Sequence, residues 1–210
     1  MNKHPRIILD VLKLMYPQAK CSLNFSDPWQ LLVATILAAQ CTDIVVNSVT
    51  PSLFKTYPSI DDMAHADIDQ VKLVIRQTGF YNNKAKSIIA SAQIIMRDFD
   101  GKVPQTMEEL VTLHGVARKT ANIVLTDAFQ KVEGIAVDTH VGRISRRLGL
   151  TEHRNPVKVE NDLCSFFFRD DWGYINHLMV YFGRDICWSA KPRCTRCPFY
   201  LDLCVSNGEF

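Results

Sequence analysis

Apolar residues recur at intervals of three and four along most of the chain, which is the spacing of one face of an α-helix. In the first predicted helix, residues 5–16, this face consists of Ile7, Ile8, Val11, Leu12 and Met15. The same pattern predicts further helices at about residues 28–39, 43–57, 59–66, 67–78, 83–99, 106–113, 118–129, 139–148, from 155–156 onward, and 172–186. No segment has the strict apolar–polar alternation of a half-buried strand, so the chain is predicted to be all-α.

Local signals mark where several of these helices begin and end. Asp27 can cap the helix at 28–39, and Pro28 suits its first turn because that turn leaves the backbone N–H unpaired anyway. This helix is apolar almost all round, which predicts a central, buried position. Gly79 is expected to end an amphipathic helix as a left-handed residue, and Asp171 is expected to cap the last long helix.

Length and composition narrow the class of protein. The chain has 210 residues, 47% of them hydrophobic and 22% charged, which is enough for one large domain or two small ones with a real core. The formal charge of +2 does not decide for or against a polyanionic partner. The polar start of the chain and the lack of an apolar run near the ~20 residues of a membrane span predict a cytoplasmic protein with no membrane partner.

Four of the seven cysteines lie close together near the end of the sequence. Cys187, Cys194, Cys197 and Cys204 form the pattern C-x6-C-x2-C-x6-C. In an intracellular protein such a group predicts a metal site rather than disulfides. Zinc is the general expectation for four cysteines, usually as two separated C-x2-C pairs, whereas the single compact run here favours an iron–sulfur centre.

A short turn at residues 113–117 separates two predicted helices. Gly115 can adopt a φ that other residues resist, and the next helix begins with unpaired N–H groups that can bind an anion. Arg118 and Lys119 add positive charge there, so the backbone phosphate of a nucleic acid would suit this place. On composition alone, an ordinary glycine turn between two helices is the simpler interpretation.

The sequence LHGVARKTANIVL at residues 113–125, followed by VDTH at 137–140, resembles the helix–hairpin–helix of the endonuclease III family of DNA glycosylases. The family pattern is close to LPGVGRKTA, so the chain departs from it at His114 and Ala117. Further matches, in chain order, are Asn24-Phe25-Ser26, Ala38-Ala39-Gln40 with Thr42-Asp43, Gly79 with Tyr81-Asn82, Lys84-Ala85, and the C-terminal cysteines. The resemblance covers essentially the whole chain.

This resemblance implies an enzyme of base excision repair that binds double-stranded DNA containing damaged bases or abasic sites. The expected enzyme is a bifunctional DNA N-glycosylase that removes oxidised pyrimidines, with an AP lyase activity that cuts 3′ of the abasic site by β-elimination. The four cysteines are expected to hold a [4Fe–4S] cluster, with zinc as the alternative. The alternatives for function are a uracil- or mismatch-directed glycosylase of the same fold and a non-catalytic DNA-binding module.

The resemblance assigns the catalytic pair to Lys119 and Asp138. With partial burial at a helix start, where the dipole disfavours cations, Lys119 would offer a nucleophilic amine that forms a Schiff base with the sugar. A solvated lysine that contacts a phosphate is the plainer alternative. Asp138 is expected to cap the helix that starts at Thr139, and its fixed carboxylate could also stabilise positive charge on the sugar.

Residues for DNA contact are also implied by the resemblance. Gln40 is the expected polar plug in the opened duplex and Phe80 the wedge, although Phe80 could instead close a hydrophobic contact. Other expected contacts follow from the residues themselves. They are His114, Gly115, Val116, Ala117 and Arg118 at the anion site of the hairpin, His140 and Arg143 after it, and Lys191 and Arg193 in the cysteine loops. Once the loops are tied down by a metal, Lys191 and Arg193 would present a basic edge to phosphates, although they could instead be a solubilising face with no partner.

The expected architecture is a two-lobed, all-α helix–hairpin–helix DNA glycosylase fold with a C-terminal cluster loop. Residues 24–132 would form a helical bundle that ends in the hairpin. Residues 1–23 and 133–210 would form a second helical domain, with the cluster loop at 187–204. The active site would lie between the two domains, where clefts usually form. The protein is expected to be a monomer, and nucleoid-associated if bacterial.

Overall fold

The computed structural model describes residues 4–206, and this part of the chain contains α-helices and short 3-10 helices but no strand. The all-α prediction is therefore confirmed. The chain divides into two compact units. The hairpin unit is Ser22–Lys131, and the cysteine unit consists of the described residues of Met1–Cys21 and Val132–Phe210.

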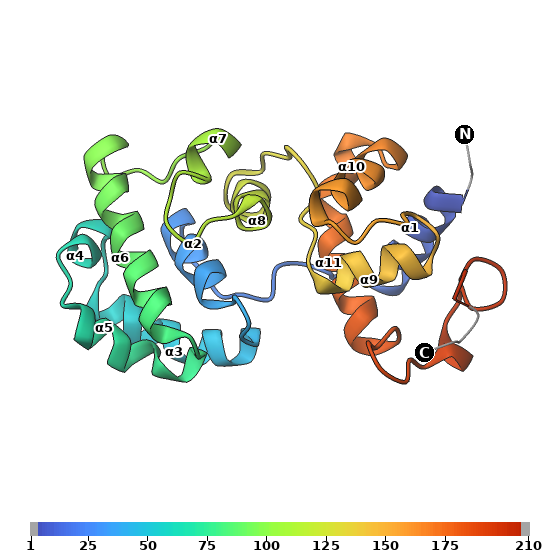
Figure 1. Cartoon of the computed structure of the whole chain (residues 1–210), viewed down its shortest axis with the longest axis horizontal. Helices are drawn as coiled ribbons and strands as arrows, with labels where there is room; N and C mark the ends of the chain where they lie inside the picture. The colour runs from blue at the N-terminus through green and yellow to red at the C-terminus, as the bar shows by residue number, and fades with distance from the viewer. Residues whose placement is uncertain (1–3, 207–210) are drawn as a thin grey trace. The chain divides into compact units, whose positions relative to one another are not determined.

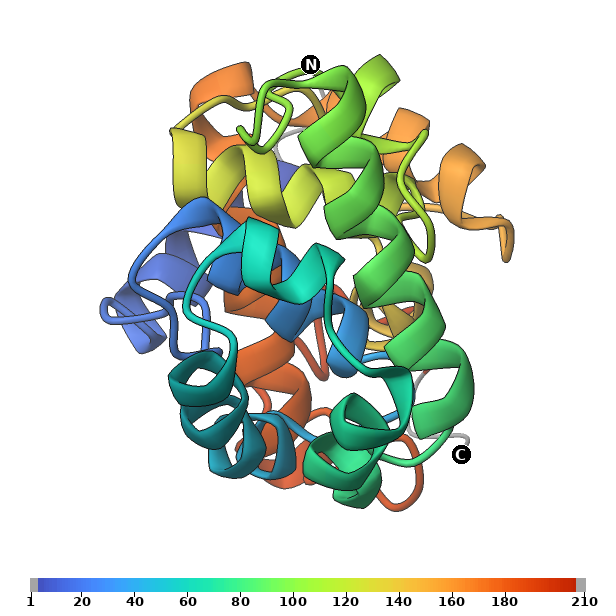
Figure 2. The same cartoon turned by 90° about the vertical axis from the view of Figure 1, so that its left-hand side faces the viewer.

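The hairpin unit is built around helix α2. Its elements are α2 (Pro28–Leu37), α3 (Asp43–Thr56), α4 (Ile60–Ala64), α5 (Ile68–Ile75), η1 (Arg76–Thr78), α6 (Tyr81–Asp98), α7 (Met107–Leu110) and α8 (Arg118–Phe129). Helix α2 packs against α3, α6 and α8, whereas the long helix α6 packs against α4 and α5 as well (Figure 1). In Figure 2, α6 is the long green helix beside the shorter helices of this unit.

The sequence of α2 explains its central place. The Asp27 side chain accepts a hydrogen bond from the backbone N–H of Gln30 at 2.9 Å, and Pro28 occupies the first turn, as predicted. Every residue from Leu31 to Leu37 is buried. Because each fully buried aliphatic side chain contributes about 1.5–3 kcal/mol, this helix is a major source of stability for the hairpin unit.

The cysteine unit joins the first helix of the chain to the last ones. Its elements are α1 (His4–Met15), α9 (Thr139–Arg147), α10 (Pro156–Phe166), η2 (Arg169–Asp171), α11 (Trp172–Asp185) and η3 (Cys194–Arg196). Helix α11 packs against both α1 and α9 (Figure 1). Ile8, Leu12, Ile144 and Phe182 are buried in one core, so segments far apart in sequence share the same apolar interior.

Asp171 does not cap α11, so that prediction is wrong. Its backbone is helical and its side chain makes no capping hydrogen bond. The preceding turn η2 runs directly into α11, and the carboxylate instead accepts hydrogen bonds from Lys13 Nζ at 2.5 Å and from Arg6 at 3.2 Å. This largely buried carboxylate therefore ties α1 to the start of α11.

A membrane-spanning helix would need both length and an apolar surface. No helix within residues 4–206 has both in the degree that crossing a bilayer requires.

Candidate functional site: the hairpin, two helix starts and the cysteine pocket

The hairpin between α7 and α8 requires glycine at position 115. Gly115 has a φ of 76°, in the left-handed region that favours glycine. A Cβ at this position would lie 2.9 Å from the Cβ of Ser87 on α6, too close for any real side chain. On either side, Leu113 and Val116 are buried and anchor the turn. Both the backbone conformation and the close approach to α6 therefore exclude larger residues.

The hairpin is also fixed by hydrogen bonds. Ser91 Oγ on α6 donates to the carbonyl of His114 at 2.9 Å, and the N–H of Val116 donates to the carbonyl of Leu113 at 3.2 Å. The predicted helix before the turn extended to residue 113, but α7 ends at Leu110. The chain there continues in i→i+3 hydrogen bonds, which tighten the turn. The His114 side chain is exposed.

Helix α8 begins without a side-chain cap. Ala117 is in the extended capping conformation but makes no side-chain hydrogen bond to the first turn. Arg118 and Lys119 follow in that turn, and both side chains are exposed. The partial burial expected for Lys119 is therefore wrong, because the buried face of α8 begins only at Ala121. The open end of the helix dipole and two cationic side chains make this end suitable for an anion.

Helix α9, unlike α8, begins with a side-chain cap. The Asp138 side chain accepts a hydrogen bond from the backbone N–H of Val141 at 2.8 Å, which confirms the predicted N-cap. The residue is half-buried. Asp138 belongs to the cysteine unit and Lys119 to the hairpin unit. The predicted action of this pair on one sugar stays a prediction.

Four exposed residues of the hairpin unit other than glycine have left-handed backbones, and Gln40 and Phe80 are two of them. Gln40, just after α2, has a φ of 53°, and Phe80, just before α6, has a φ of 47°. The Phe80 side chain is 64% exposed, although phenylalanine normally lies in the core. This exposure disfavours the alternative in which Phe80 closes a hydrophobic contact. Strained backbones of this kind cluster at functional sites.

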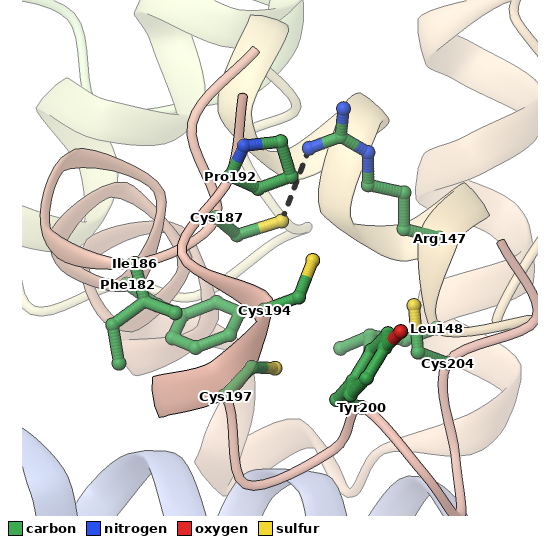
Figure 3. Close-up of a pocket in the computed structure, with 10 residues that line it drawn as sticks. All are labelled: Arg147, Leu148, Phe182, Ile186, Cys187, Pro192, Cys194, Cys197, Tyr200 and Cys204. Carbon is green, nitrogen blue, oxygen red and sulfur yellow. Dashed lines mark hydrogen bonds between the residues drawn. The ribbon is translucent and has the colours of Figure 1, made fainter. Parts of the chain in front are cut away.

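The four clustered cysteines line one pocket of the cysteine unit (Figure 3). The other lining residues are Arg147, Leu148, Phe182, Ile186, Pro192 and Tyr200. Among residues 4–206, no three His, Cys, Asp or Glu side chains converge closely enough to hold a single metal ion. Four thiols arranged around one pocket are a donor set that either an iron–sulfur cluster or a zinc ion takes.

Basic side chains hold the loop that starts at Cys187. An Arg143 N–H donates to the Cys187 carbonyl at 2.9 Å. An Arg147 N–H donates to the Cys187 Sγ at 3.3 Å (Figure 3). Arg147 also donates to the carbonyls of Trp188 and Ser189. Burial lowers the pKa of Arg143, whereas the nearby Cys187 acts to raise it. The loop is thus tied to α9 by two arginines.

Burial also affects the cysteine thiols. It raises the pKa of Cys197 to about 11, and raises the pKa of Cys194 as well, with the other cysteines adding to the effect. A metal binds the thiolate form of cysteine, so its binding would displace the protons that these thiols otherwise keep.

The other predicted DNA contacts in this unit have different surroundings. Lys191 is exposed with a φ of 52°. Arg193 lies 4.1 Å from the centre of the Trp188 ring and pairs with Asp185 at 3.8 Å. The backbone of Gly183 lies close to His140, where a Cβ would be 2.5 Å from the His140 Nδ1.

One residue without a predicted role, Lys84, proves unusual. Its side chain is buried and its Nζ donates to two backbone carbonyls, those of Leu37 and Thr78. Its place on the apolar face of α6, beside Ala85 and Ile88, is the signal that could have revealed it in the sequence. A lysine on a buried helical face is rare unless its charge has partners.

Comparison with known proteins agrees with this architecture. The family model described as "HhH-GPD superfamily base excision DNA repair protein" matches residues 33–167. Endonuclease III of Synechocystis sp. is 50% identical over 199 residues, covering 95% of this chain and 90% of that protein. Endonuclease III of Bacillus subtilis is 42% identical over 203 residues, covering 96% and 92%.

Solved structures are similar as well. A trapped endonuclease III–DNA covalent intermediate has a TM-score of 0.94 and 38% identity, and the match covers 100% of this chain and 97% of that one. A thermostable thymine-DNA glycosylase has a TM-score of 0.88 over 100% and 99% of the chains, but at 20% identity this likeness shows the fold alone.

The fold and the family match define a base excision DNA repair protein of the helix–hairpin–helix class. The chain belongs to the endonuclease III family. It is accordingly a bifunctional DNA repair enzyme, a DNA glycosylase with AP lyase activity, which confirms the family and the enzyme class that the sequence predicted.

Proposed function

We propose that this enzyme removes oxidised pyrimidines from double-stranded DNA and then cuts the strand on the 3′ side of the resulting abasic site. The observation that carries the proposal is the exposed Lys119 in the uncapped first turn of α8, directly after a hairpin that is fixed to α6. Support also comes from the 38% identical endonuclease III, which was trapped in a covalent complex with DNA.

The chemistry assigned to Lys119 has two stages. Its neutral amine attacks C1′ of the sugar, and the glycosidic bond breaks with its electron pair leaving on the base, which takes up a proton. The sugar ring then opens to a Schiff base on Nζ. Loss of a proton from C2′ breaks the C3′–O bond, and the 3′ phosphate leaves. Water finally releases the lysine from the unsaturated sugar.

Asp138 is assigned the electrostatic part of the reaction. Its carboxylate is held by the Val141 N–H and stays fixed while positive charge develops on the sugar. It also takes the proton that the attacking amine loses. Because the cap orients the carboxylate before the substrate arrives, no reorganisation is needed during the reaction.

DNA binding is assigned to several groups of residues. In the hairpin, the backbone of His114, Gly115, Val116 and Ala117, with Arg118, would hold a phosphate at the open start of α8. In the cysteine unit, the proposed phosphate contacts are His140, Arg143, Lys191 and Arg193. The exposed Gln40 and Phe80 would fill the space left by the displaced nucleotide.

A [4Fe–4S] cluster is the cofactor we assign to the cysteine pocket. Cys187, Cys194, Cys197 and Cys204 would hold it, since they line one pocket and their single compact run favours a cluster over a zinc ion. When bound, the cluster would cross-link the loops and, depending on its surroundings, accept or donate an electron. The bound loop would present Lys191 and Arg193 to phosphates. We place the enzyme in the cytoplasm, on the DNA, as a monomer.

Borohydride trapping tests the role of Lys119. Reduction of the Schiff base should link the wild-type enzyme covalently to a duplex with a single thymine glycol. Lys119→Ala should lose this adduct completely, whereas Lys102→Ala, which removes another exposed lysine of the same unit, should keep it. An adduct that survives in Lys119→Ala would show that another amine is the nucleophile.

A panel of duplexes tests the choice of lesion. Thymine glycol should be excised faster than uracil, than thymine opposite guanine, and than adenine opposite 8-oxoguanine. Preference for uracil or for a mismatch would replace the proposed substrate with the alternative one. Tight binding to an abasic analogue without any cleavage would leave only a DNA-binding module.

A further inference from the structure

Lys84 links two segments of the hairpin unit that are far apart in the sequence. The residue is only 5% exposed, and its Nζ donates to the carbonyls of Leu37 and Thr78, both at 2.8 Å. Burial lowers the pKa of Lys84, whereas the nearby Cys41 acts to raise it. A buried ammonium is unfavourable unless its N–H donors find acceptors, so these two hydrogen bonds explain why a cation is tolerated here.

The two acceptors lie at comparable places in the fold. Leu37 is the last residue of α2, and Thr78 is the last residue of η1. Carbonyl groups at the ends of helices lack intrahelical partners and carry the negative end of the helix dipole. A single ammonium from α6 therefore satisfies two helix ends at once and fixes the distance between them.

Each clamped carbonyl comes shortly before an exposed residue with a left-handed backbone. Gln40 lies three residues after Leu37, and Phe80 lies two residues after Thr78. Phe80, at the N-cap position of α6, makes no capping hydrogen bond of its own. The Lys84 hydrogen bonds are thus a direct connection between the two segments.

We propose that Lys84 is a positioning residue that holds the segments 38–41 and 79–80 at a fixed separation, so that Gln40 and Phe80 enter the DNA as one rigid pair. This inference rests on the proposed function of the two residues. A wedge and a plug can hold a duplex open only if they do not move independently, because opening it costs unstacking and unpairing energy. Flexible segments would lose part of that energy as they become ordered on the DNA.

The clamp itself can be tested on the full-length enzyme without DNA. Lys84→Met keeps an unbranched apolar side chain but removes the donors, whereas Lys84→Gln, which is equally one atom shorter than lysine, keeps an N–H donor group. Lys86→Met, on the exposed face of the same helix, is the matched control. Hydrogen exchange at residues 38–41 and 79–81 should be at least about 10-fold faster in Lys84→Met, intermediate in Lys84→Gln and unchanged in Lys86→Met.

The functional part needs two substrates. On a duplex with thymine glycol beside 2-aminopurine, Lys84→Met should show less fluorescence increase and about 10-fold slower single-turnover excision. On a duplex with a preformed abasic site, which has no damaged base to unstack, strand cleavage should stay within about 3-fold of wild type. Lys84→Gln should recover part of the excision rate, a recovery that would not be expected if Lys84 only filled space.

Each outcome decides the matter. Unchanged exchange in both segments would overturn the clamp. Faster exchange with an equal fall of excision and abasic-site cleavage would reduce Lys84 to a general stabilising residue. If Lys84→Met does not fold, Lys84→Gln carries the same comparisons. Should the wild-type enzyme excise no lesion at all, the proposed function fails, while hydrogen exchange still reports on the clamp.

Discussion

The starts of α8 and α9 solve the same backbone problem in opposite ways. At α9 the side chain of Asp138 accepts a hydrogen bond from the first turn, whereas at α8 Ala117 offers none. The open start of α8 is followed by Arg118 and Lys119, and the capped start of α9 keeps a fixed carboxylate. The difference shows how one structural feature, a helix N-terminus, can serve either as an anion site or as a mount for a negative charge.

The largest effect is expected from substitutions that separate the capping role of Asp138 from its electrostatic role in excision. Asp138→Asn should keep the cap, because asparagine caps as well as aspartate, but should slow excision on the order of 100- to 1000-fold by removing the charge. Asp138→Ala should be equally slow and also less stable by about 1 kcal/mol. Single-turnover excision and urea unfolding measure the two effects. Equal activity of Asp138→Asn and wild type would leave Asp138 as a cap only.

A change in the hairpin should have the next largest effect. Gly115→Ala combines a left-handed φ with a contact to Ser87 and should lose about 1–3 kcal/mol of stability. Gly101→Ala has a similar φ of 71°, but its new Cβ would meet only the flexible end of the Met96 side chain, so it should lose less. Thermal unfolding of both variants measures the comparison. Equal losses would mean that the close approach to Ser87 has no energetic weight.

A smaller effect is expected from the charge at the open helix start. Arg118→Ala should weaken binding to undamaged and damaged duplexes alike and reduce the slope of log affinity against log salt by about 0.9. Fluorescence anisotropy between about 50 and 200 mM salt measures this slope. If the slope does not change, Arg118 does not neutralise a phosphate.

The smallest effect is expected from a substitution that makes the start of α8 resemble the start of α9. Ala117→Ser supplies a side-chain cap and should stabilise the protein by about 0.5–1 kcal/mol, because it occupies an N–H of the first turn. The same change should weaken DNA binding several-fold if that N–H binds a phosphate. Urea unfolding and anisotropy on one sample give both values. Stabilisation with undiminished affinity would place the phosphate elsewhere.

Local patterns in the sequence determined much of the protein. The helical periodicity, the caps at Asp27 and Asp138, and the turn at Gly115 were all predictable, because each depends on neighbours within one or two turns of helix. The spacing of the four cysteines likewise pointed to a shared site, and all four line one pocket.

Contacts between residues far apart in the sequence were decided only by the tertiary structure. Asp171 pairs with Lys13, 158 positions away, instead of capping its own helix, and Lys84 reaches Leu37 across 47 positions. The exposure of Lys119 also depended on which face of α8 the rest of the unit covers. Such outcomes follow from how whole helices pack. The apolar face of α6 could signal that Lys84 is buried, but no pattern within a few residues encodes which distant partners these side chains reach.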